Sequence, residues 1–224
     1  MGKMAGFTGF PPDVLDFFVE LEGNNDRPWW QANKERFEAS VAEPMRALLD
    51  VLEPEFGVFK VFRMNRDVRF SADKSPYKTA HAAMTERDGG AANYVQVSAT
   101  GLLVGSGIYH MAPDQLGRFR AAVGDERTGA AVEEATAAAR RARLDIAGIE
   151  PALVTAPRGW PKDHPRVALL RMKGLITVRD FGAPAWVHSG RTANEVAKAW
   201  RAGSPVTKWL EANVGPTEEP PRPR

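Results

Sequence analysis

The side chains with the clearest capacity for chemistry lie in one basic and polar segment, between Lys60 and Lys78. It holds six basic residues against two acidic ones, a local net charge of +4, whereas the whole chain carries only +2. Guanidinium and amide groups bind phosphate and carboxylate groups through directed hydrogen bonds. The segment therefore predicts a site for a small phosphorylated or carboxylated ligand. Its candidate ligand-binding residues are Arg63, Asn65, Arg66, Asp67, Arg69, Asp73, Lys74, Tyr77 and Lys78.

The geometry expected of this segment is a strand followed by a turn. If Val58–Arg69 is extended, alternate side chains share a face, which separates Arg66 from the other arginines. One face would carry Arg63, Asn65, Asp67 and Arg69, and Arg66 would lie on the other face. A turn at 73–76 would bring Lys74 and Lys78 over the same surface. The aromatic residues that could stack on a planar ligand are Phe70 and Tyr77.

Two other interpretations of the segment stay open. Arg63–Asp67 and Arg69–Asp73 could be ion pairs on a solvated face, where such pairs contribute about 0–1 kcal/mol. The segment would then serve a structural or protein-interaction role. It could also bind single-stranded nucleic acid by stacking bases on its aromatic residues, although the small net charge of the chain disfavours nucleic acid.

Asp163 and His164 form the next candidate pair. The histidine could act as a general acid or base, with a carboxylate fixing its tautomer. In the structural alternative, Asp163 caps a short helix that has Pro165 in its first turn. No nucleophile can be named, so the sequence leaves open whether the protein is an enzyme.

The chain has no cysteine, which excludes disulfides, thiolate nucleophiles and Cys-ligated metal centres. Its four histidines lack metal-ligand spacing, so neither a metal nor a cofactor is expected. No apolar run approaches the roughly 20 residues that span a bilayer, and the N-terminus has no signal-peptide pattern. We therefore expect a soluble, cytoplasmic protein without a membrane partner. The oligomeric state cannot be read from the sequence.

Both helices and strands are expected to position these residues. Apolar periodicity predicts a helix at 12–22 and a second helix that Pro44 kinks or restarts, and the alanine-rich composition of 126–144 predicts a further helix. Alternation and short turns predict antiparallel strands at 58–64, 79–85, 93–99 and 102–109. A capping box at Thr192–Glu195 predicts the start of a C-terminal helix, with a restart at Pro205. The expected fold is α+β: one domain over residues 1–215, a mainly antiparallel sheet of about 4–6 strands with N- and C-terminal helices, and a disordered tail at 216–224.

Four motifs resemble a family of uncharacterised proteins, domain of unknown function 2461, over about residues 7–213. They are Asn24-Asn25-Asp26-Arg27-Pro28-Trp29 with Asn33-Lys34, the run from Arg63 to Lys78, Gly105-Ser106-Gly107-Ile108-Tyr109, and Pro157-Arg158-Gly159-Trp160 with Lys162-Asp163-His164-Pro165. This chain departs from the family pattern at Ser106, where a glycine is usual, and at Tyr109, where tryptophan is frequent. The resemblance implies a shared fold and supplies no activity.

Overall fold

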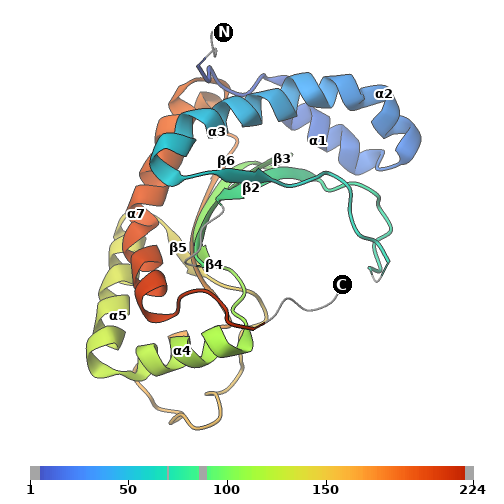
Figure 1. The fold of residues 1–224 in the computed structure, drawn as a ribbon. Helices are drawn as coiled ribbons and strands as arrows, with labels where there is room; N and C mark the ends of the chain where they lie inside the picture. The colour runs from blue at the N-terminus through green and yellow to red at the C-terminus, as the bar shows by residue number, and fades with distance from the viewer. Residues whose placement is uncertain (1–5, 70, 86–89, 220–224) are drawn as a thin grey trace. The chain divides into compact units, whose positions relative to one another are not determined.

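The computed structural model of the protein describes residues 6–69, 71–85 and 90–219. Within these residues, one six-stranded sheet has the order β1-β2-β3-β4-β6-β5 (Figure 1). The strands are β1 (Phe59–Val61), β2 (Ala80–Thr85), β3 (Ala92–Ser98), β4 (Gly101–Ile108), β5 (Asp145–Ala147) and β6 (Leu175–Gly182). The sheet is antiparallel, so the α+β prediction is confirmed. β1, β2, β3 and β4 begin within two residues of their predicted starts, whereas β5 was not predicted.

The helices precede, interrupt and follow the strands in the chain. They are α1 (Asp13–Gly23), α2 (Arg27–Phe37), the π-helix η1 (Glu38–Ala42), α3 (Glu43–Phe56), α4 (Pro113–Gly124), α5 (Glu126–Arg141), α6 (Val167–Leu170), the 3-10 helix η2 (Ala185–His188) and α7 (Arg191–Asn213). No helix among the described residues is both long and apolar enough to cross a membrane.

The N-terminal helices follow from local sequence signals. Val14, Phe17, Phe18 and Leu21 form the apolar stripe of α1 and are all buried. Asp26 caps α2, because its carboxylate accepts a hydrogen bond from the backbone N–H of Trp29 at 2.8 Å. Pro44 is the second residue of α3, which directly follows the π-helical turn η1, and its missing N–H interrupts the helical hydrogen bonds there.

The described chain divides into two compact units. The first contains the described parts of residues 1–86, 94–104 and 180–198, and the second contains those of 87–93, 105–179 and 199–224. The first unit includes α1, α2, η1, α3, β1 and β2, and the second includes α4, α5, β5 and α6. The extent of one domain over 1–215 stays a prediction.

The C-terminal part differs from expectation in two places. The capping-box prediction is wrong because α7 already begins at Arg191, and the hydroxyl of Thr192 donates to the carbonyls of Trp186 and Val187 in η2. α7 also continues through Pro205 without restarting. In the segment predicted as a disordered tail, the Thr217 hydroxyl donates to Asp114 of α4 at 2.8 Å. Residues 220–224 of that segment lie outside the described residues.

Candidate anion-binding site

The basic segment forms a long loop between β1 and β2 (Figure 1). β1 ends at Val61, so the strand predicted at 58–64 is shorter than expected. The two arms of the loop nevertheless stay paired: Asn65 and Tyr77 form an isolated antiparallel bridge. Flanking hydrogen bonds join Arg66 N–H to Pro76 O at 2.9 Å and Lys78 N–H to Met64 O at 2.8 Å. The loop therefore holds Arg66 and Lys78 at a fixed position relative to β2.

A side chain from the turn between α1 and α2 anchors this bridge. The amide of Asn25 donates to Tyr77 O at 3.0 Å, and its oxygen accepts from Tyr77 N–H at 3.1 Å. The ring of Tyr77 is stacked on Trp30, with centroids 4.3 Å apart and planes 15° apart. Since Tyr77 is only 4% exposed, its ring belongs to the core, and stacking on Trp30 replaces the ligand contact expected from the sequence.

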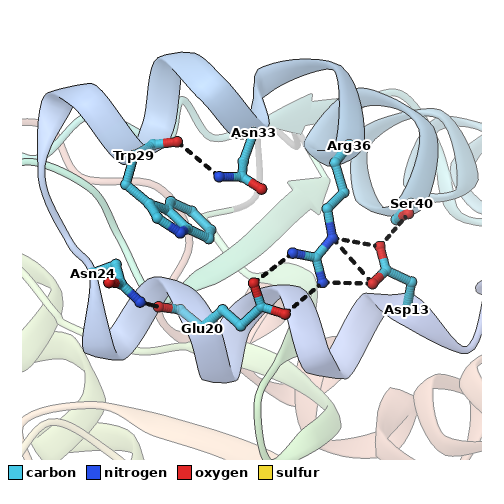
Figure 2. Close-up of polar contacts among 7 residues, drawn as sticks. All are labelled: Asp13, Glu20, Asn24, Trp29, Asn33, Arg36 and Ser40. Carbon is cyan, nitrogen blue, oxygen red and sulfur yellow. Dashed lines mark hydrogen bonds and ion pairs between the residues drawn. The ribbon is translucent and has the colours of Figure 1, made fainter.

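The α1–α2 pair that presents Asn25 is itself held by one arginine (Figure 2). Arg36 of α2 bonds Asp13 at 2.6 Å and Glu20 at 2.7 Å, both on α1. Ser40 adds a hydrogen bond to the second oxygen of Asp13 at 2.8 Å. The hydrogen bond from Arg36 is the main reason that the pKa of Asp13 lies below its ordinary value.

The tip of the loop is held by its own charges. Asp67 pairs with Arg69 at 2.7 Å, and Asp73 pairs with Arg66. These pairs differ from the Arg63–Asp67 and Arg69–Asp73 pairs that the sequence suggested. Hydrogen bonds from Arg69 lower the pKa of Asp67 to about 2, and those from Ser75, followed by Arg66, lower the pKa of Asp73 to about 2. Lys74 donates to the carbonyl of Val68 at 3.0 Å.

A groove lies at the base of this loop, on one face of β2. It encloses about 490 Å³ and is lined by Phe62, Arg66, Lys78, Thr79, Ala80, Ala82 and Tyr94. The period of two places Lys78, Ala80 and Ala82 on the same side of the strand. Because Ala80 and Ala82 end at Cβ, they leave open space in the groove between the larger rings of Phe62 and Tyr94.

Lys78 is the most informative residue in the groove. Its ammonium nitrogen lies 5.3 Å from the centroid of the Phe62 ring. Among the described residues, no carboxylate forms an ion pair with it. Burial, followed by the charge of Arg63, lowers its pKa from the ordinary value. A half-buried cation without a counter-ion marks a place where an external anion would be stabilised.

Arg66 contributes the second cation of the groove. It uses Nη1 for Asp73. Within the described parts of the chain, its other guanidinium N–H groups have no hydrogen-bond partner. A guanidinium has five donors in a rigid fork, so Arg66 can keep Asp73 and still bind a second anion.

The predicted site residues therefore separate into groups. Arg66 and Lys78 line the groove, whereas Asp67, Arg69, Asp73 and Lys74 hold the loop tip. Arg63 and Asn65 are exposed beside the groove without lining it. Phe70 lies outside the described residues.

Asp163 and His164 belong to the second unit. The helix there begins at Val167 with Arg166 as its N-cap, so the prediction that Asp163 caps it is wrong. His164 forms a local contact before this helix: its Nδ1 accepts from the backbone N–H of Arg166 at 3.0 Å. A ring that accepts at Nδ1 carries its proton on Nε2. The ring packs edge-on against Trp160, 5.5 Å between centroids.

Phe62, Thr79, Ala80, Ala82 and Tyr94 are the groove residues that sequence reasoning missed. The alternation Lys78-x-Ala80-x-Ala82 was a usable signal, because two small residues on one strand face leave room beside a lysine. The described residues contain no group of three or more His, Cys, Asp or Glu side chains that could hold a metal ion.

No curated protein and no solved structure matches the chain. A family model does match, over residues 13–209, and its description is "Conserved hypothetical protein (DUF2461)". The matched region contains both the Asn24–Trp29 turn and the Arg63–Lys78 loop, the two motifs that the Asn25–Tyr77 hydrogen bonds join. The chain therefore belongs to the DUF2461 family.

Proposed function

We propose that the protein binds a small phosphorylated or carboxylated ligand in the groove between the loop and β2. The observation that carries this proposal is Lys78, half-buried and without a carboxylate partner among the described residues. Removing a cation from water without a counter-ion is unfavourable. A bound anion would offset the free energy lost when the Lys78 ammonium is partly removed from water.

Arg66 supports the same proposal. It lines the groove together with Lys78, and its guanidinium N–H groups without a partner among the described residues suit the bidentate geometry that phosphate and carboxylate accept. The groove volume of about 490 Å³ lies within the range of about 300–1,000 Å³ that is typical of small-molecule sites. A structural role is better supported for Asp67 and Arg69, which pair with each other at the exposed loop tip.

Two arginines of the loop provide a matched test. Arg66→Gln removes a groove cation, and Arg69→Gln removes an arginine of the loop tip. Thermal unfolding is measured for both variants and the wild type with phosphate, pyrophosphate, citrate and succinate, at constant ionic strength with chloride as the reference. An anion at 100 times its dissociation constant raises the unfolding temperature by about 5–10 °C for a protein of this size.

We expect at least one of these anions to stabilise the wild type and Arg69→Gln, and to stabilise Arg66→Gln much less. If the two variants respond equally, the ligand does not bind at the groove. If none of the anions stabilises the wild type, the proposed function is wrong for these ligand classes.

A further inference from the structure

The groove combines two cations with two aromatic rings, and this combination restricts the ligand further. We infer, building on the proposed function, that the ligand carries its anionic group next to a planar ring. Phe62 and Tyr94 both line the groove, with ring centroids 6.4 Å apart and planes inclined by 44°. Together they form an apolar wall beside Lys78 and Arg66.

The spacing between charge and ring sets the size of the ligand. The Lys78 ammonium lies 5.3 Å from the centre of the Phe62 ring. If a ligand places its ring against the wall and its phosphate or carboxylate next to Lys78, only a few bonds can separate the ring from that anionic group. A compact aryl phosphate meets this condition, whereas an aliphatic anion would leave the aromatic wall in contact with water.

Tyr94 contributes mainly through its ring. Its hydroxyl donates to Gln96 Oε1 at 2.7 Å, which fixes the orientation of the side chain. The face that the ring presents to the groove is then preorganised, and stacking against a preorganised ring loses little conformational entropy. Burial is the reason that the pKa of Tyr94 is raised above its ordinary value, so the phenol stays neutral beside an anion.

The two aromatic residues that the sequence suggested for stacking do not form this wall. Tyr77 is committed to Trp30 in the core, and Phe70 lies outside the described residues. Tyr94 of the wall lies on β3, and Phe62 directly follows β1. In the sheet, β2 lies between these two strands.

The test compares two probes of equal charge, phenyl phosphate and methyl phosphate, by isothermal titration calorimetry. In the wild type we expect phenyl phosphate to bind at least about tenfold more tightly, a difference of about 1.4 kcal/mol. Tyr94→Leu and Phe62→Leu should bring this ratio close to one while methyl phosphate keeps its affinity. Tyr94→Phe retains the ring and should retain the ratio.

One control variant and two outcomes in the wild type distinguish a failure of this inference from a failure of the proposed function. Tyr109→Leu removes an exposed aromatic residue that does not line the groove, and it should leave the ratio unchanged. If both probes bind the wild type equally, the ring inference is wrong and the anion site stands. If neither probe binds, the proposed anion site is contradicted for phosphates and the inference fails with it. Unfolding curves of each variant confirm that the compared proteins are folded.

Discussion

The side-chain amide of Asn25 hydrogen-bonds both backbone polar groups of Tyr77, at 3.0 and 3.1 Å, as a neighbouring strand would. The two residues are 52 positions apart in the chain. This contact fixes the returning arm of the loop that ends at Lys78. It joins the Asn24–Trp29 turn to the Arg63–Lys78 loop.

The first prediction tests this anchor. Asn25→Ala removes both hydrogen bonds and leaves part-buried backbone groups of Tyr77 without them, so we expect a loss of about 1–3 kcal/mol in unfolding free energy. Asn24→Ala is the matched control, since Asn24 makes one exposed bond to the Glu20 carbonyl and should cost clearly less. Urea unfolding of the two variants measures the difference. Equal stabilities would show that Asn25 does not anchor the loop.

The second prediction concerns the arginine that joins α1 to α2 (Figure 2). The Arg36 side chain is 26% exposed and bonds two carboxylates, so Arg36→Met should lower the unfolding free energy by about 1–3 kcal/mol. Arg46→Met removes a pair with Glu38 in which both side chains are about half exposed, and it should cost about 0–1 kcal/mol. A loss in Arg36→Met no larger than in Arg46→Met would contradict the clamping role.

A third prediction follows from His81, which is 5% exposed and packs edge-on against Phe37. Its Nδ1 has no hydrogen-bond partner in the described structure. Burial, the largest cause, and the charge of Arg46 lower the pKa of His81 from 6.5 to about 4. The folded state therefore favours the neutral ring, so stability is full above about pH 6.5 and falls as the pH drops towards 4.

This histidine should contribute a loss of up to about 3 kcal/mol across that window. His81→Leu removes the contribution, so its unfolding free energy should fall less steeply than that of the wild type between pH 7 and pH 4.5. His110→Leu, at an exposed position, should keep the wild-type slope. Parallel pH profiles for the wild type and His81→Leu would show that His81 is not the titrating group.

The fourth prediction explains a glycine of the Gly105–Tyr109 motif. Gly107 has φ +131°, and a Cβ there would lie 2.3 Å from the carbonyl oxygen of Leu175. Gly107→Ala should therefore destabilise the protein by at least about 2 kcal/mol. At Gly105 the nearest atom to an added Cβ is 3.4 Å away, without a positive φ, so Gly105→Ala should cost less. Thermal unfolding compares them, and similar losses would mean that the close approach of β4 and β6 does not require Gly107.

The helices and most strands were predictable because local patterns determine them. The apolar stripe of α1, the Asp26 cap and the alternation along β3 are each contained in a few consecutive residues. β5 has only three residues, too few for a periodic signal. Thr192 matched the capping-box pattern, yet the preceding η2 supplied carbonyl partners for its hydroxyl, and the sequence pattern does not contain this information.

The segment that holds the site was predictable from its charge, but its internal organisation was not. Whether Asp73 pairs with Arg66 or Arg69 depends on the path of the loop. The role of Tyr77 depends on Trp30, which lies in a helix distant in sequence. Tyr94 reaches the groove because β3 pairs with β2 in the register Met84–Tyr94. Such long-range pairings follow from tertiary packing and have no local sequence signal.

The anion site is tested most directly by the affinity of the protein for inorganic phosphate after removal of one groove charge. Lys78→Gln removes the ammonium that has no carboxylate partner among the described residues, and Lys74→Gln removes a loop-tip lysine of the same charge that does not line the groove. Isothermal titration calorimetry at constant ionic strength should show Lys78→Gln binding about 10–100-fold more weakly than the wild type, with Lys74→Gln close to the wild type. Equal affinities in the wild type and Lys78→Gln would contradict an anion site at this groove.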